Sequence, residues 1–365
     1  MDLRFLTINF ISALALTGCG VKWGMPTVEL TKSSRALLVA ASDYQTGSLV
    51  RLDIERHTAN LKYAPIHSDA IVVSFPQVPD IFVINRLGAD NIQRIDPTTG
   101  TTLAQWSVGI GANPQDMWVY GDYAYVSFLQ KSYLLKMNLK TGETITKIDL
   151  SSYADSDGFP ESARMADVDG RLWIQLQRLN QEKNYAPANS SQIVVVDPDQ
   201  DRVIQTIDLR ASNPTTPFKM TGDEYVLVGE SGYVGSESRL DGGIEKIDTR
   251  NYQSLGFITT ELQLGGDIVD FECWSQEKCV AIISKPATEL VSFNPRNGAL
   301  EKRIIVSSGF YLKQVIYDKH DDLLYLADGN PRGPSVRVFS SSLQEQWDLG
   351  WKLELPPYQM KLLDY

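Results

Sequence analysis

A turn motif that recurs along most of this 365-residue chain constrains the fold more than any other feature. Each copy follows a short run of β-branched and aromatic residues. The copies are 42 to 59 residues apart and begin at Asp53, Asp96, Asn138, Asp197, Asp248, Asn294 and Ser340. A period of about 40 to 50 residues, with four strands in each unit, is typical of a β-propeller blade. The seven copies therefore predict an all-β, seven-bladed β-propeller with four antiparallel strands per blade.

One unit shows the whole pattern. Asn113-Pro114 opens its innermost strand and Gly121-Asp122 forms the first turn. Further strands are expected over residues 123–128, 132–138 and 143–150. The unit resembles the YVTN-type repeat of quinoprotein amine dehydrogenase-like propellers, although here Gly precedes Asp in the turn, whereas Asp169-Gly170 in the next unit has the order of that family. The resemblance covers most of residues 35–365 and implies the propeller fold, which hosts many unrelated functions.

The two ends of the repeat predict how the ring closes. Residues 36–40 fit the second strand of a blade, so the first blade lacks its inner strand. Residues 357–363 align with the inner strands that begin near Pro114 and Pro217. We therefore expect the C-terminal strand to join the N-terminal blade, which would leave no open sheet edge at the seam. The alternative is an edge strand that belongs to the last blade alone.

The N-terminus has the pattern of an export signal. Residues 1–18 contain a charged start, an apolar run and a small-residue end, and the run is too short to span a bilayer. Leu16-Thr17-Gly18-Cys19 resembles the bacterial lipobox, which implies fatty acylation of Cys19. Residues 19–34 would then tether a single propeller domain, residues 35–365, to the cell envelope. Gly20 favours the outer membrane by analogy with enteric sorting; the alternative is an ordinary signal peptide with an incidental cysteine.

Charge and cysteine content restrict the possible partners. The chain has 34 Lys and Arg against 45 Asp and Glu, a net charge of −11, which argues against nucleic acid as a partner. With Cys19 acylated, Cys273 and Cys279 remain, on either side of a predicted strand-to-strand turn. An oxidising envelope permits a disulfide between them. Two reduced core thiols are the alternative.

Sequence motifs for catalysis are not recognisable, and no catalytic residue and no cofactor is predicted. Three His residues leave little material for a multi-histidine metal site. Asp155, Asp157 and Glu161 have a spacing of carboxylates that could bind Ca²⁺ through oxygen. The full twelve-residue calcium loop is missing, so a solvated acidic loop is the preferred interpretation.

Binding residues are expected at the mouth of the channel and in two loop insertions. The positions that begin the inner strands, or immediately precede them, are His67, Asp69, Asp116, Arg164, Lys219, Asp267, Lys313 and Gln359. Insertions at 177–191 and 230–243 add Arg178, Tyr185, Tyr233 and Arg239, residue types that are common in interface hot spots. Passive loop extensions are the alternative for both insertions.

Three functions are compatible with these features. The preferred one is a non-enzymatic, lipid-anchored envelope propeller that binds a protein, glycan or small ligand. The second is an enzyme that acts on a small envelope substrate at the central channel, similar to propeller lactonases or quinoprotein dehydrogenases. The third is a Ca²⁺-stabilised adhesion module. The scarcity of His and the lack of a catalytic cluster favour the first.

Overall fold

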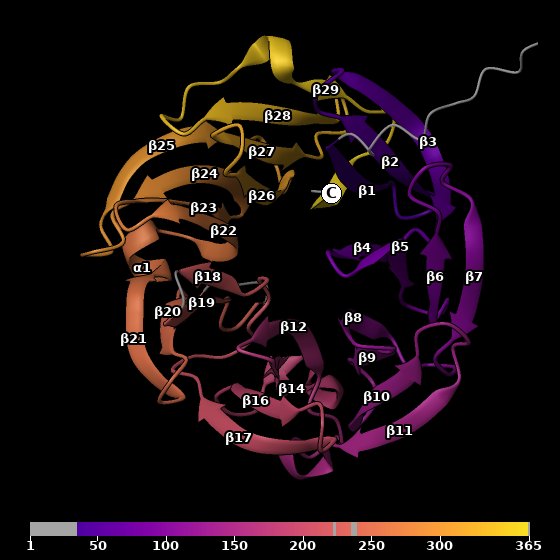
Figure 1. Cartoon of the computed structure of the whole chain (residues 1–365). Coiled ribbons are helices and arrows are strands. Elements are labelled where there is room, and N and C mark those ends of the chain that lie inside the picture. Colours follow the sequence, from indigo (N-terminus) through magenta and orange to yellow (C-terminus); the bar gives the residue numbers. More distant parts are fainter. Residues whose placement is uncertain (1–34, 222–223, 235–238, 364–365) are drawn as a thin grey trace, which may run out of the picture. The chain divides into compact units, whose positions relative to one another are not determined.

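Seven four-stranded antiparallel sheets form a ring around a central channel (Figure 1). The computed structural model describes residues 35–221, 224–234 and 239–363. The predicted fold class is therefore confirmed, including the number of blades. The predicted signal peptide (1–18) and the predicted tether (19–34), with its acylation site Cys19, lie outside the described residues. In the part of the chain that the structure describes, no helix has the length and apolar character needed to cross a membrane.

Six blades follow the order of the chain from the channel outward, and each blade takes the name of its inner strand. Their strands are β4 (Ala70–Phe75), β5 (Val78–Asn85), β6 (Asn91–Ile95) and β7 (Thr102–Ser107); β8 (Pro114–Tyr120), β9 (Tyr123–Phe128), β10 (Tyr133–Asn138) and β11 (Thr144–Asp149); β12 (Ser162–Val168), β13 (Arg171–Leu176), β16 (Gln192–Asp197) and β17 (Arg202–Asp208); β18 (Lys219–Thr221), β19 (Tyr225–Glu230), β20 (Gly243–Asp248) and β21 (Gln253–Thr260); β22 (Asp267–Ser275), β23 (Lys278–Lys285), β24 (Ala287–Phe293) and β25 (Leu300–Val306); and β26 (Leu312–Asp318), β27 (Leu323–Asp328), β28 (Ser335–Ser340) and β29 (Trp351–Lys352).

The seventh blade joins the two ends of the propeller. Its inner strand is β30 (Pro357–Leu363), followed outward by β1 (Ala36–Ser42), β2 (Gly47–Asp53) and β3 (Thr58–Ile66). β30 and β1 are antiparallel, and Val39 lies opposite Met360 in their register. The expected closure of the ring by the C-terminal strand is confirmed.

Hydrophobic side chains pack between neighbouring blades. β1 is buried along its whole length, whereas the outer strand β11 is mostly exposed. Phe82 of the β4 blade and Met117 of the β8 blade belong to one buried cluster, and similar clusters fill the other boundaries. Because each blade buries both sheet faces against its neighbours, the core is a set of layers between blades rather than one central cluster.

Polar side chains join adjacent inner strands around the channel. In each case a carboxylate or amide oxygen on one inner strand accepts a hydrogen bond from a backbone N–H of the next inner strand. The pairs of acceptor and donor are Asp116 with Met165, Asp270 with Val315, Gln314 with Met360, and Gln359 with Val72. These contacts hold neighbouring blades in register at the centre of the ring, where side-chain space is smallest.

The two remaining cysteines are bonded to each other. Cys273 and Cys279 lie opposite each other on β22 and β23, with their Cα atoms 4.2 Å apart. The predicted disulfide and its position across a strand-to-strand turn are therefore confirmed.

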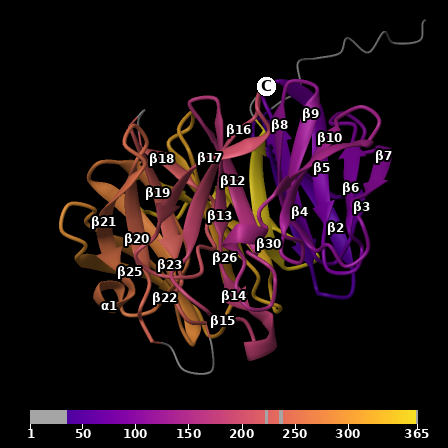
Figure 2. The same cartoon turned by 90° about the horizontal axis from the view of Figure 1, so that it is seen from below.

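The ring has two different faces (Figure 2). The loops that lead into the inner strands lie on one of them, called the loop face. The hairpin of β14 (Leu179–Asn180) and β15 (Ala186–Pro187) and the helix α1 (Glu261–Leu264) belong to this face. Short 3₁₀ helices are η1 (Ser151–Tyr153), η2 (Gln181–Lys183) and η3 (Trp347–Leu349). On the other face, the terminal face, Arg35 forms ion pairs with Asp318 and Asp321.

Candidate ligand-binding channel

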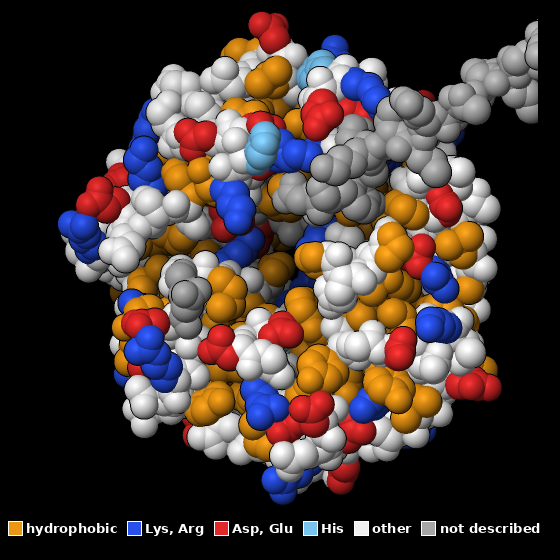
Figure 3. Space-filling model, in the orientation of Figure 1, with side chains coloured by type: hydrophobic (Ala, Val, Ile, Leu, Met, Phe, Trp, Pro, Cys, Tyr) orange, Lys and Arg blue, Asp and Glu red, His pale blue; other side chains and the backbone are white. Residues whose placement is uncertain are grey.

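The inner strands enclose a cavity of about 230 Å³ in the channel. Six of the seven blades contribute to its wall, because it is lined from β4, β12, β22, β26, β30 and the loops before β6 and β18. The lining residues on the inner strands lie near the start of each strand. Because these starts are at the loop face, the cavity lies toward that face. On the terminal face, Lys and Arg side chains are visible around the central hollow (Figure 3).

Two cationic side chains in this cavity have no acidic partner at ion-pair distance among the described residues. The Arg164 guanidinium forms no hydrogen bond there; burial lowers its pKa, and the charge of Asp116 acts in the opposite direction. The Lys313 ammonium lies 4.0 Å from the centroid of the Phe310 ring, and burial lowers its pKa. Both cations can therefore bind an anion without first breaking an ion pair.

A carboxylate with one free oxygen faces the same cavity. Asp270 is 3% exposed; its Oδ2 accepts a hydrogen bond from the Val315 backbone N–H at 2.9 Å, and its Oδ1 has no partner among the described residues. Burial raises the pKa of the Asp270 carboxyl to about 6, against the lowering effect of Lys219. Lys219 itself pairs with Glu272 at 2.8 Å. Asp270 can therefore accept a proton or a hydrogen bond in the neutral pH range.

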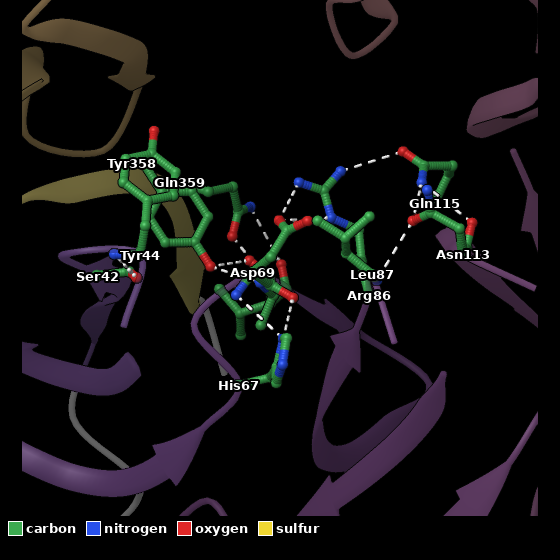
Figure 4. Close-up of polar contacts among 12 residues, drawn as sticks. Ser42, Tyr44, His67, Asp69, Arg86, Leu87, Asn113, Gln115, Tyr358 and Gln359 are labelled. Atoms are coloured by element: carbon green, nitrogen blue, oxygen red, sulfur yellow. Dashed lines mark hydrogen bonds and ion pairs between the residues drawn. The ribbon is translucent and has the colours of Figure 1, made fainter. Parts of the chain in front are cut away.

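Hydrogen bonds fix the part of the cavity wall that lies near the seam (Figure 4). Arg86 pairs with Asp69 and donates to Gln115 Oε1 at 3.1 Å. The Tyr358 hydroxyl exchanges hydrogen bonds with the backbone of Ala70. Gln359 does the same with Val72. This part of the wall is preorganised, since its polar groups are already bonded in the free protein.

Two bulky residues beside this wall have strained backbone conformations (Figure 4). Tyr44 has φ of 66° and Leu87 has φ of 42°, and both side chains are largely exposed. A left-handed conformation costs such residues roughly 1 to 3 kcal/mol, and such strain is common at binding sites. The Ser42 hydroxyl accepts a hydrogen bond from the Tyr44 N–H at 2.8 Å and supports this turn. Nothing in the sequence distinguished these two residues.

Irregularities in the inner strands direct the charged residues into the channel. The register of β8, β12, β22 and β26 with the neighbouring strand shifts near the start of each strand. These shifts occur at or directly before Asp116, Arg164, Asp270 and Lys313. A β-bulge re-aims the side chains around it. In the β12, β22 and β26 blades, the bulges therefore place Arg164, Asp270 and Lys313 around one space.

The structure separates the predicted channel residues into three groups. Arg164, Lys313 and Gln359 line the cavity. Asp69, Asp116 and Lys219 are engaged in ion pairs or hydrogen bonds between strands. His67 accepts a hydrogen bond from the Asp69 N–H at 3.2 Å, and Asp267 lies at the start of β22, outside the cavity lining.

Sequence reasoning missed Arg86, Asp270 and Tyr358 as lining residues. Asp270 could have been found by aligning Asp270-Phe271 with Asp116-Met117, because both Asp residues follow a bulge. Arg86 lies in a loop between the second and third strands of its blade, where the repeat has no constant residue.

The residues of the two insertions lie outside the channel cavity. Arg178 donates to the Ser190 carbonyl at 3.1 Å, and Tyr185 is 44% exposed beside β15. The Arg239 guanidinium lies 3.9 Å from the centroid of the Tyr233 ring. Their role in binding stays a prediction.

The candidate calcium carboxylates all accept hydrogen bonds from N–H groups of the protein. Asp155 and Asp157 accept hydrogen bonds from N–H groups within their own loop. Glu161 is fully buried and accepts from the Leu179 N–H and the Gln181 side chain; burial raises its pKa to about 8. Across residues 35–221, 224–234 and 239–363, no group of three or more His, Cys, Asp or Glu is arranged to hold a metal ion.

Comparison with known proteins supports the fold and leaves the activity open. No family profile and no curated protein matches the chain. Among solved structures, proteins provisionally described as 6-phosphogluconolactonases are similar in fold. The one from Bacteroides uniformis has 12% identity and a TM-score of 0.64, and covers 91% of this chain and 100% of its own. The one from Bacteroides fragilis has 12% identity and a TM-score of 0.61, with 92% and 99% covered.

The dihydro-haem d1 dehydrogenase NirN, solved in complex with DHE, is also similar. It has 13% identity and a TM-score of 0.55, and the match covers 90% of this chain and 75% of that one. Identities this low establish the fold alone. The protein is therefore a seven-bladed β-propeller with a charged central channel.

Proposed function

We propose that this protein is a lipid-anchored propeller of the bacterial envelope whose channel binds a small organic anion, such as a carboxylate or a phosphate ester. The observation that supports this proposal is the presence of Arg164 and Lys313 in the cavity without an acidic partner. An anion bound between the Arg164 guanidinium and the Lys313 ammonium would accept charge-assisted hydrogen bonds from both. These bonds are stronger than neutral ones and would compensate for the hydration that the three groups lose. A cavity of about 230 Å³ suits a molecule of a few carbon atoms.

Binding of simple anions to the protein tests the channel site. We would titrate citrate, succinate and inorganic phosphate by calorimetry into the wild type and the variants R164Q and K313Q. Loss of one charged hydrogen bond costs about 1.5 to 3 kcal/mol, or roughly 10 to 150-fold in Kd. R202Q and K302Q remove the same residue types from the exposed outer strands β17 and β25, and should bind as the wild type does. Equal affinities in all five proteins would overturn the proposal.

The lipid anchor requires a separate test. C19S should remove labelling by a clickable palmitate analogue and release the protein from the membrane fraction, because stable anchoring depends on the acyl chains. Unchanged labelling in C19S would contradict the lipoprotein assignment without affecting the channel site.

A hydrolytic enzyme is the second candidate, and Asp270 is the observation that favours it. Its free Oδ1 and a pKa of about 6 suit a general base near neutral pH. Asp270 would take a proton from a water molecule as the water oxygen forms a bond to an ester or lactone carbonyl carbon. The C–O bond to the leaving oxygen would then break, and protonated Asp270 would return the proton to that oxygen, which gives an acid and an alcohol. The likeness to provisionally described lactonases makes glucono-δ-lactone a reasonable probe. The rate of hydrolysis would be measured by pH-stat titration. Hydrolysis by the wild type that is lost in D270N would support this activity. A hydrolysis rate with the wild type equal to that in buffer alone would exclude it for this substrate.

A further inference from the structure

The outermost strand of the β26 blade is interrupted, unlike those of the other blades. β29 has two residues, whereas the outer strands β3, β7, β11, β17, β21 and β25 have six to nine. The Gln346 N–H bonds the Val338 carbonyl at 2.8 Å, so the chain runs beside β28 before η3 and again at Trp351. The segment between β28 and β29 projects outward from the ring (Figure 1).

This interruption places an indole ring in solvent. Trp347, the first residue of η3, is 76% exposed. The Arg337 guanidinium lies 5.7 Å from the centroid of its ring. Arg337 is itself held by Glu345 through two hydrogen bonds of 2.7 Å and by Asp328 at 3.4 Å. The Trp347 ring therefore stands beside a rigid array of charged groups.

A pocket of about 360 Å³ lies between this segment and β28. Its wall includes the groups just described together with Gln346 and Trp351. Trp351 is 7% exposed, and its Nε1–H has no acceptor among the described residues. The ring of Trp351 packs against that of His57, with centroids 4.8 Å apart. The pocket thus combines an exposed aromatic ring with planar polar side chains.

We propose that this pocket, the Trp347 site, binds a saccharide. The C–H face of a pyranose ring is flat and apolar and can pack on the indole, while its hydroxyl groups exchange hydrogen bonds with carboxylate, guanidinium and amide groups. Asp328, Arg337 and Glu345 supply such groups in a fixed arrangement, so little side-chain entropy is lost on binding. A protein partner that covered Trp347 with an apolar surface would remove these charged groups from water, at a cost in binding free energy. The site is independent of the channel, and its ligand would be an oligosaccharide of the cell envelope if the protein is anchored there, as proposed above.

Calorimetry with defined oligosaccharides tests the Trp347 site. We would titrate the tetramer of β-1,4-linked N-acetylglucosamine and cellotetraose into the full-length protein and W347A. We expect binding of at least one of them and a loss of at least tenfold in affinity in W347A, with partial recovery in W347F. L255A removes an exposed apolar side chain from the outer strand β21 and should bind as the wild type does.

Two results would overturn the proposal. One is no binding of either tetramer at millimolar concentration, and the other is equal affinity in the wild type and W347A. Because Trp347 is exposed, W347A should melt within a degree or two of the wild type, so loss of binding would not reflect unfolding. K313Q should leave saccharide binding unchanged, which separates a failure of this site from a failure of the channel proposal.

Discussion

Truncation of Met360 to alanine tests how much the packing of β30 contributes to the free energy of unfolding of the closed ring. Met360 is 1% exposed and belongs to a buried cluster with Leu37 and Val39 of β1 and Tyr325 of β27. This cluster lies at the boundary between the blade that β30 shares with β1 and the neighbouring β26 blade. Truncating a buried Met to Ala costs about 2 to 5 kcal/mol through lost burial and the cavity left behind. With a urea m-value of about 3 kcal/mol/M, the unfolding midpoint should fall by roughly 1 M.

Urea titration followed by tryptophan fluorescence and circular dichroism measures this change, and a matched control exists. Met220 also lies on an inner strand, β18, but is 47% exposed. M220A should lower the free energy of unfolding by less than about 1 kcal/mol, since surface substitutions usually have small effects. Similar midpoints for M360A, M220A and the wild type would refute the reasoning, because they would mean that the seam contributes little to stability.

Three further outcomes are expected. Replacing Cys273 and Cys279 with Ser should lower stability by about 2 kcal/mol, as expected for a small disulfide loop, and the wild type in reductant should melt at the same temperature as the double variant. The pKa of the Glu161 carboxyl is raised from 4.5 to about 8, so the folded chain keeps a proton that the unfolded chain releases. Stability should then fall as pH rises from about 5 to 8, and E161Q should flatten this fall in melting curves; an unchanged slope would contradict the assignment. Anion affinity should decrease as pH rises through about 6, because ionised Asp270 repels the ligand, and calorimetry should find this dependence absent in D270N.

Most of the fold could be predicted because propeller repeats are local. The strands of residues 113–150 were placed within one or two residues, since turn residues and β-branched runs lie next to each other in the chain. The disulfide followed from the same local reasoning. The channel was predicted less well: Arg164, Lys313 and Gln359 line the cavity, but Asp270 was missed in favour of Asp267. A single extra residue in β22 changes which side chain faces the channel, and the repeat pattern does not reveal it.

The sequence by itself determined the number of blades, the closure of the ring and the cysteine pair, because each depends on residue order and short-range geometry. The tertiary structure decided which charges are free. The channel contains acids and bases in similar number, and only their positions show that Asp69 is paired with Arg86 and Lys219 with Glu272. Arg164, Lys313 and one oxygen of Asp270 are left facing the cavity. Ion pairing depends on distances between residues from different blades, and those distances exist only once the ring has closed.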